Sequence, residues 1–204
     1  MRLYVYPISP NVRRVRLVAA VLGVELEETV LDFTKGEHKT PEYLAINPNG
    51  AVPTLVDGDF VLTESRSITQ YLAAKKPESG LLPFDEQARA DVTRWQFWDA
   101  AHFAPQLGTV AFQRILKKRF GMGEPDVNKV NEALSNFARF AAVLDKHLDG
   151  KRYLVGDSLT LADLTLASSL MYAEQSEVPL AEFPNLLAWF SRISDMDAWR
   201  KTSP

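Results

Sequence analysis

The chain has 204 residues, of which 46% are hydrophobic and 24% are charged, as is typical of a globular protein with one large or two small domains. Its formal net charge of −3 gives no reason to expect nucleic-acid binding, and no apolar run is long enough to span a bilayer. The absence of cysteine excludes disulfides, thiolate metal sites and a cysteine nucleophile, and the three histidines argue against a histidine-rich metal site. Because a proline interrupts the opening residues too early for a signal peptide, we expect a cytoplasmic protein.

The first 76 residues alternate between strand and helix signals. Residues 2–6 are aromatic and branched, which predicts a strand, and a second strand is expected around Val30. Between them, Ser9 followed by Pro10 is a capping residue with proline at the first helical position, and Gly23 ends the helix. This strand–helix–strand unit predicts a parallel strand pair with a right-handed crossover.

The rest of this segment predicts a short helix, a hairpin and a longer helix. Thr40 and Pro41 begin the short helix, and the turn at Asp57-Gly58 joins two antiparallel strands. A further helix begins at Ser65. Residues 1–76 are therefore expected to form an α/β domain with a mixed four-stranded sheet.

Residues 77–85 are rich in proline and polar residues and predict a linker. Residues 86–204 show only helical patterns, which predicts an all-helical domain with a kink at Pro105. Thr160 with Asp163 three residues later is a variant of the capping box, and the helix it begins is apolar nearly all round. That helix is expected at the centre of the bundle.

Three places in the chain are candidates for chemistry: Val52-Pro53, Ser9 and Glu64-Ser65. Val52-Pro53 stands before a strand, and its peptide bond can be trans or cis; a cis bond would leave the Val52 backbone free to pair with an extended ligand. Ser9 and Ser65 are first of all helix-start residues, but hydroxyls at helix N-termini also suit anions. Glu64 can pair with an ammonium group, so Glu64-Ser65 suits the α-amino-acid end of a ligand.

Other polar and aromatic residues have a plain structural interpretation beside a functional one. His38 and Lys39 are solvated loop residues or ligand donors. Trp98 and Phe103 are core residues of a helix or the lining of an apolar pocket.

Taken together, the segments resemble the cytosolic glutathione transferases over essentially the whole chain. The most specific part is Asn47-Pro48-x-Gly50-x-Val52-Pro53-x-Leu55, followed by Leu62-Thr63-Glu64-Ser65-Arg66-x-Ile68-x-x-Tyr71-Leu72. The resemblance implies a thioredoxin-like first domain, an all-helical second domain and a serine-dependent enzyme of a phi-like, theta-like or related bacterial class. It further implies conjugation of the glutathione thiolate to apolar electrophiles.

The resemblance also implies roles for individual residues. Pro53 should follow a cis bond, and the Val52 backbone should pair with the cysteinyl part of glutathione. Glu64 and Ser65 should hold the γ-glutamyl end, whereas His38 and Lys39 resemble the pair that contacts the glycine carboxylate.

Ser9 falls where the serine-dependent classes place the hydroxyl that activates the thiol, with Asn11 and Tyr6 as rivals. The pocket for the electrophile is expected to be lined by Ile8, Asn11, Trp98, Phe103 and Phe112.

The resemblance implies glutathione as cosubstrate without a permanently bound cofactor or metal, and a homodimer. Nucleic-acid and membrane partners are not expected from the net charge and the lengths of the apolar runs. Two alternatives stay open. One is a glutathione-dependent isomerase or peroxidase on the same scaffold. The other is a non-catalytic binding or regulatory protein with the same fold.

Overall fold

The computed structural model describes residues 1–203, and the chain divides into two compact units. The first unit contains residues 1–82 and the segment that begins at Asp197. The second unit contains residues 83–196. No helix among the described residues is long and apolar enough to cross a membrane.

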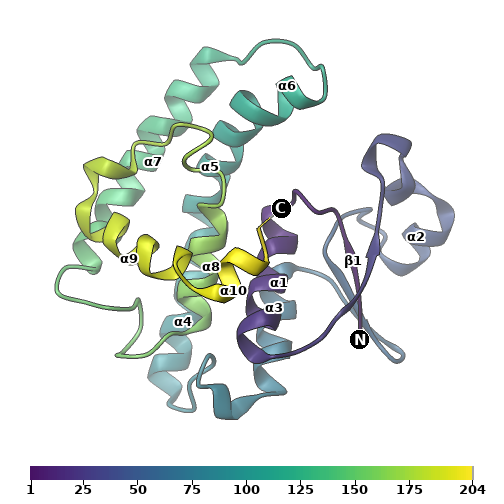
Figure 1. Ribbon diagram of the computed structural model, residues 1–204, viewed down its shortest axis with the longest axis horizontal. Helices are drawn as coiled ribbons and strands as arrows, with labels where there is room; N and C mark the ends of the chain where they lie inside the picture. Colours follow the sequence, from purple (N-terminus) through teal and green to yellow (C-terminus); the bar gives the residue numbers. More distant parts are fainter. Residues whose placement is uncertain (204) are drawn as a thin grey trace. The chain divides into compact units, whose positions relative to one another are not determined.

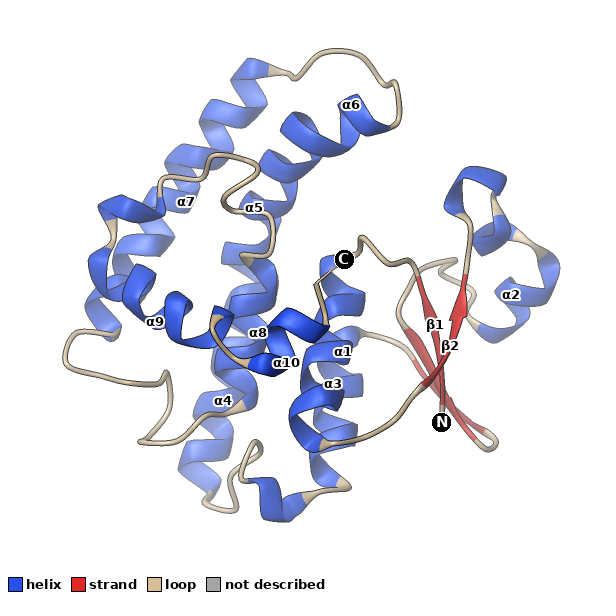
Figure 2. Cartoon of the chain, viewed as in Figure 1, coloured by secondary structure: helices blue, strands red, loops and turns tan. Residues whose placement is uncertain are grey.

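A four-stranded mixed sheet forms the centre of the first unit (Figure 2). Its strands are β1 (Arg2–Val5), β2 (Glu27–Val30), β3 (Thr54–Asp57) and β4 (Phe60–Leu62), in the order β2-β1-β3-β4. β1 pairs with β2 in parallel and with β3 antiparallel, and β3 and β4 form the expected hairpin. Both the mixed sheet and the thioredoxin-like topology implied by the resemblance are confirmed.

The helices of this unit are α1 (Pro10–Leu22), α2 (Pro41–Ile46), α3 (Ser65–Ala74) and α10 (Asp197–Lys201). α1 and α3 lie side by side on one face of the sheet, and α2 lies on the other (Figure 1). The apolar face of α1 explains this packing, because Val12, Val15 and Val18 have no exposed surface. This layering brings the first turns of α1 and α3 together.

The second unit is all-helical, as expected. Its helices are α4 (Glu86–Trp98), α5 (Ala104–Ala111), α6 (Lys117–Arg119), α7 (Val127–His147), α8 (Leu161–Ser169) and α9 (Pro184–Ser194). Every residue of α8 is buried, which matches its nearly uniform apolar sequence. The interruption expected at Pro105 takes the form of a π-helical turn, Asp99–Phe103, directly before α5, whose second residue is Pro105.

The segment from Asp197 corrects the domain boundary expected from sequence, which assigned residues 86–204 to the helical domain. α10 packs on α1, and the guanidinium of Arg13 lies 3.7 Å from the ring centroid of Trp199. Arg13 also donates hydrogen bonds to the Trp199 carbonyl (3.2 Å) and to the Ser203 hydroxyl (3.1 Å). This buried arginine gives the segment its partner in the first unit, a long-range contact that helical periodicity does not reveal.

A buried carboxylate organises the start of α8. Asp163 has no exposed surface and accepts four hydrogen bonds, from the backbone N–H of Leu154, the N–H and hydroxyl of Thr160, and the indole of Trp189. Burial raises the pKa of this carboxyl, whereas the bonds from Trp189, Leu154 and Thr160 oppose the rise. Asp163 therefore links the loop before α8 to α9.

We expect Asp163→Asn to destabilise the protein although the side chains have the same shape. All four partners are donors, so the new amide group would face an N–H or O–H group and leave a buried donor without an acceptor. The free energy of unfolding should fall by about 1–3 kcal/mol. Calorimetric melting of the wild type and the variant checks this expectation.

Asp85→Asn is the matched control. Asp85 caps α4 by accepting one hydrogen bond from the Ala88 N–H (2.8 Å), and asparagine is an equally good cap in an exposed position. Its unfolding free energy should change by less than about 0.5 kcal/mol. Equal melting shifts for the two variants would show that the donor set around Asp163 has no special role.

Candidate functional site

The loop between α2 and β3 has the geometry expected at Val52-Pro53. The peptide bond between these residues is cis, which confirms the expectation from the resemblance. Pro53 is buried and Val52 is half-buried. Within residues 1–203, neither the N–H nor the C=O of Val52 takes part in a hydrogen bond, so both groups are available to a ligand.

Three buried side chains hold this loop by one acceptor, the carbonyl oxygen of Ala51. The hydroxyl of Tyr43 donates to it at 2.6 Å, the amide of Asn47 at 2.8 Å, and the hydroxyl of Thr54 lies at 3.3 Å. The same three side chains contact one another, because Thr54 Oγ1 lies 2.9 Å from both the Tyr43 hydroxyl and Asn47 Nδ2. The network fixes the residue directly before Val52.

Asn47 is fully used inside this network. Its two amide hydrogens go to Ala51 and Thr54, and its Oδ1 accepts from the backbone N–H of Asn49 at 3.0 Å. Burial raises the pKa of Tyr43, so its hydroxyl stays protonated and remains a donor. Neither residue was assigned a role from sequence, where Asn47 appeared only as the first residue of the motif around Pro53.

Glu64 and Ser65 form the turn into α3. Glu64 is exposed and has a positive φ of 66°, which is unusual for a residue other than glycine and costs on the order of 1–3 kcal/mol. Its side chain makes no capping bond to α3. Ser65 is the first residue of α3 and is 4% exposed. The turn thus leaves an exposed carboxylate beside a helix N-terminus.

The first turn of α1 contributes a second helix N-terminus. Ser9 caps the helix by accepting from the backbone N–H of Val12 at 3.4 Å, as its sequence position predicted. Asn11 is exposed, and its Oδ1 accepts from Nη1 of Arg14 at 2.6 Å. The same Nη1 donates to the Ser65 hydroxyl oxygen at 2.7 Å, which ties the first turns of α1 and α3 together.

These elements enclose a small cavity of about 90 Å³. It is lined by Asn11, Asn47, Asn49, Ala51, Val52, Pro53, Thr63, Glu64 and Ser65. The lining is polar, with a carboxylate, several amides and hydroxyls, and two helix N-termini, which suits the charged end of a small ligand rather than a whole apolar molecule. We call this space the α1–α3 cavity.

The α1–α3 cavity brings together five of the residues singled out from sequence: Asn11, Val52, Pro53, Glu64 and Ser65. Ser9, Tyr6, His38 and Lys39 lie in the same unit but outside its lining. Arg14, which joins two lining residues, was not among the residues singled out from sequence. Its partner Ser65 is 51 residues away, so no local pattern could have revealed the contact.

His38 and Lys39 lie in the short 3-10 helix Glu37–Lys39. The His38 ring stacks on Phe33 at 3.9 Å between centroids, and Phe33 stacks on Tyr6 at 4.6 Å. Gly50 lies close against the backbone of this segment. It has a φ of +57°, and a Cβ atom there would lie 2.9 Å from the His38 carbonyl oxygen.

The aromatic residues expected in an apolar pocket lie in the second unit. Phe103 has no exposed surface and lies between Trp98 (5.5 Å between centroids) and Phe137 (5.5 Å). Trp98 is half-buried, and Phe112 is 36% exposed. Within this unit, Trp98 and Phe112 have accessible surface, while Phe103 supports Trp98 from the core.

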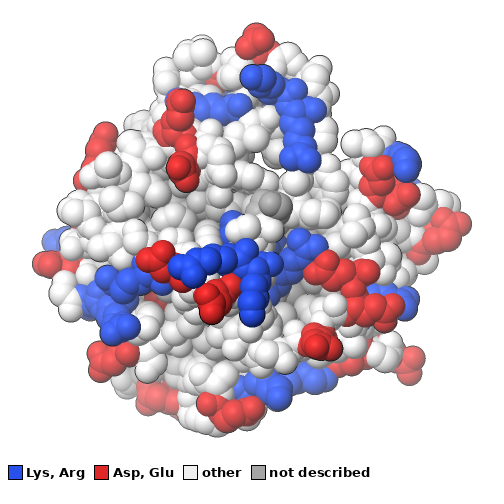
Figure 3. Space-filling model, viewed as in Figure 1, with Lys and Arg blue, Asp and Glu red and all other residues white. Residues whose placement is uncertain are grey.

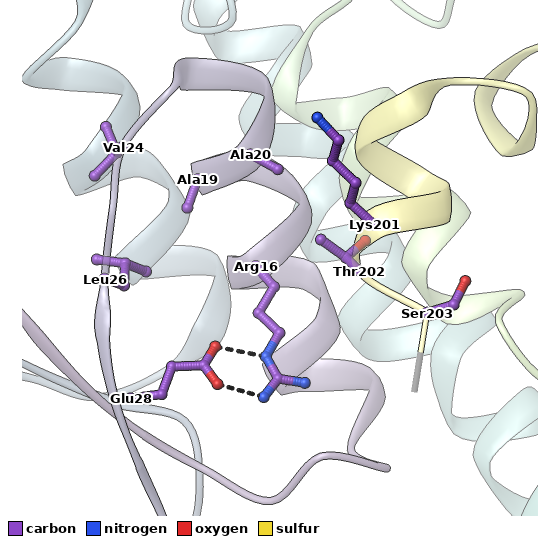
Figure 4. Close-up of a pocket in the computed structure, with 9 residues that line it drawn as sticks. All are labelled: Arg16, Ala19, Ala20, Val24, Leu26, Glu28, Lys201, Thr202 and Ser203. Atoms are coloured by element: carbon purple, nitrogen blue, oxygen red, sulfur yellow. Dashed lines mark hydrogen bonds and ion pairs between the residues drawn. The ribbon is translucent and has the colours of Figure 1, made fainter.

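The surface of the first unit has a second cavity, of about 360 Å³, between α1, the β2 segment and the end of α10 (Figure 4). The Arg16 guanidinium forms two hydrogen bonds with the Glu28 carboxylate on its wall. Acidic and basic side chains are interspersed on the face seen in Figure 3. Among the described residues, no group of three or more His, Asp or Glu side chains is placed to hold a metal ion.

Comparisons with known proteins agree across both units. The family model described as glutathione S-transferase, N-terminal domain, matches residues 3–80, and glutathione S-transferase, C-terminal domain, matches residues 103–197. Glutathione S-transferase 3 of Zea mays is 38% identical over 99% of this chain and 92% of that protein. Glutathione S-transferase D7 of Drosophila melanogaster is 34% identical over 92% of this chain and 81% of that protein.

A solved structure gives the same result. Glutathione S-transferase I from mais, in complex with an atrazine glutathione conjugate, has a TM-score of 0.90 and 33% identity, covering 99% of this chain and 95% of that one. Full-length sequence identity and a shared fold therefore point to one family. This chain belongs to the glutathione S-transferase family.

Proposed function

We propose that the α1–α3 cavity holds the γ-glutamyl end of glutathione. The observation that carries this proposal is that Glu64, Ser65 and the Val52 backbone border one polar cavity. The exposed Glu64 carboxylate suits the ammonium group, and the Ser65 hydroxyl with the amides of the first α3 turn suits the carboxylate. The cavity volume of about 90 Å³ matches one end of the tripeptide rather than the whole molecule.

The rest of glutathione is proposed to extend along the cis-proline loop. The free N–H and C=O of Val52 pair with the cysteinyl backbone as an added strand would. The network at Ala51 supports this role because it fixes the backbone directly before Val52. His38 and Lys39, on the neighbouring 3-10 helix, contact the glycine carboxylate.

A hydrogen-bond donor at the start of α1 then stabilises the thiolate. Ser9 remains our first choice, because its oxygen accepts from Val12 while its hydroxyl hydrogen is free to point at sulfur. Asn11 is the rival, since it lines the cavity and presents its amide hydrogens. The thiolate attacks an electrophilic carbon, a C–S bond forms, and the leaving group departs with the electron pair.

The cosubstrate is proposed to be an apolar electrophile. The glutathione transferase from mais whose structure contains an atrazine conjugate supports this class of substrate. Within the second unit, Trp98 and Phe112 have the accessible surface for such contacts, whereas Phe103 has none and supports Trp98 from the core. A homodimer in the cytoplasm, which the resemblance also implies, completes the proposal.

The first experiment is retention on immobilised glutathione, followed by a conjugation assay with a reactive aryl halide. We expect both retention and turnover. Retention without turnover on a panel of electrophiles would favour a binding or regulatory protein, and isomerase or peroxidase activity alone would favour the other alternative. No retention would overturn the assignment of the cavity.

The choice between Ser9 and its rivals is tested by Ser9→Ala, Asn11→Ala and Tyr6→Phe. If Ser9 stabilises the thiolate, Ser9→Ala raises the pKa of the bound thiol and lowers turnover at neutral pH by about 10- to 100-fold. The sign follows from the thiolate fraction, which falls at fixed pH when the pKa rises, so activity should recover as the pH is increased. Glutathione affinity should change little.

Tyr6→Phe is the matched control, because it removes a hydroxyl and keeps the ring that stacks on Phe33. It should leave the pH profile of turnover unchanged. An unaltered rate in Ser9→Ala together with a shifted profile in Asn11→Ala would transfer the role to Asn11.

Gly50→Ala tests whether the loop that carries His38 and Lys39 belongs to the site. The new methyl group would meet the His38 carbonyl oxygen at 2.9 Å, so the two loops must move apart. We expect weaker glutathione binding, by about tenfold, and a loss of about 1–2 kcal/mol in stability from the left-handed backbone. Titration calorimetry and thermal melting measure the two effects.

Gly58→Ala separates the effect on glutathione binding from the effect on stability. Gly58 has a similar φ of +62° but no atom within 4 Å of the added Cβ, and it lies in the β3–β4 turn. This variant should lose similar stability and bind glutathione normally. Equal binding by the two variants would exclude the loop from the ligand site.

A further inference from the structure

Arg14 makes an unusual pair of contacts for a buried cation. It lies on α1 with only 1% of its surface exposed. Its Nη1 atom donates to Asn11 Oδ1 at 2.6 Å and to Ser65 Oγ at 2.7 Å. Both acceptors line the α1–α3 cavity, whereas Arg14 itself does not.

The chemistry of a guanidinium decides how these two partners are oriented. A guanidinium has five N–H donors and no acceptor, so each partner must present an oxygen lone pair to it. Asn11 therefore turns its carbonyl oxygen to Arg14 and keeps its NH₂ group for another contact. Ser65 accepts through its oxygen and keeps its own hydrogen for another contact.

We propose that Arg14 is a positioning residue that makes Asn11 and Ser65 hydrogen-bond donors toward the bound ligand. Without it, either side chain is free to present an acceptor, which would repel an anionic group. With it, the cavity offers two fixed donors at the first turns of two helices, and donors next to a charged group are strengthened. This inference rests on the proposed binding of glutathione, whose γ-glutamyl carboxylate would receive the Ser65 hydrogen.

The neighbouring residue provides a matched control. Arg13 is also on α1 and is 3% exposed, but it contacts Trp199 and Ser203 and does not line the cavity. Replacing either arginine by methionine removes a buried guanidinium and keeps an unbranched side chain. Both changes should lower the melting temperature, but only Arg14→Met should act on the ligand.

The experiment compares the full-length wild type, Arg14→Met and Arg13→Met by titration calorimetry with glutathione. We expect Arg14→Met to bind about tenfold more weakly and Arg13→Met to bind within about twofold of the wild type. In a Ser65→Ala background, the effect of Arg14→Met should shrink to about threefold or less, because one of its two routes to the ligand is gone. Equal weakening by both arginine variants would mean a structural effect and would overturn the inference.

A glutathione analogue without the γ-glutamyl α-carboxylate distinguishes the proposed role from a general loss of stability, because a general loss would weaken binding of the analogue and of glutathione alike. The wild type should bind this analogue weakly, and Arg14→Met should weaken it by about threefold or less. A full tenfold loss with the analogue contradicts the proposed role of Ser65 as the intermediary.

Arg14→Lys serves if the methionine variant does not fold. Lysine also has only donors, so Arg14→Lys should recover more than half of the binding free energy that Arg14→Met loses. If Arg14→Met does not fold, Arg14→Lys should bind glutathione within about fivefold of the wild type. Binding more than about tenfold weaker in a folded lysine variant overturns the inference. Failure of the wild type to bind glutathione overturns the proposed function and this inference together. Normal wild-type binding with no effect of Arg14 overturns this inference alone.

Discussion

The site depends on one backbone oxygen, the carbonyl of Ala51. Tyr43, Asn47 and Thr54 converge on it from α2, the following turn and the start of β3. Buried polar groups are costly unless they are paired, so each of these side chains is held by the others as well as by Ala51. The consequence is a loop held firmly at Ala51 by buried side chains, next to a Val52 backbone that has no hydrogen-bond partner among the described residues.

Rigidity at this loop has a direct bearing on binding. A flexible loop would have to be ordered by the ligand, and that ordering would subtract from affinity. Here the ordering is already supplied by protein side chains, and Gly50 keeps the adjacent His38 segment close. The positive φ of Glu64 is a second source of local strain, which the surrounding fold compensates. This strained turn places the Glu64 carboxylate beside the N-terminus of α3.

Local signals in the sequence predicted much of this arrangement. The caps at Ser9 and Thr160, the hairpin turn at Asp57-Gly58 and the alternation of elements led to the observed order of strands and helices. The motif around Pro53 led to the cis bond through its resemblance to a family. These features could be predicted because each is encoded by residues a few positions apart in the sequence.

The features that sequence reasoning missed depend on distant partners. Arg14 meets Ser65 across 51 residues, and the Ala51 network requires α2 to pack beneath the loop. The boundary at Asp197 was wrong for the same reason, because a short amphipathic segment looks alike whether it packs on helices of its own domain or on α1. Helical periodicity reports that a face is buried but does not report what buries it.

The docking of α10 has a consequence for how the chain is assembled. Arg13 and the Trp199 carbonyl are 186 residues apart in sequence, and all of the second unit lies between them. During synthesis, α1 leaves the ribosome long before α10 does. Until α10 is made, the face of α1 that carries Arg13 stays uncovered. In sequence, the helical unit is inserted into the first unit. The contact between Arg13 and Trp199 therefore joins residues of high sequence separation, and such contacts form slowly. The contact between Trp199 and Arg13 is therefore expected to form last as the new chain folds.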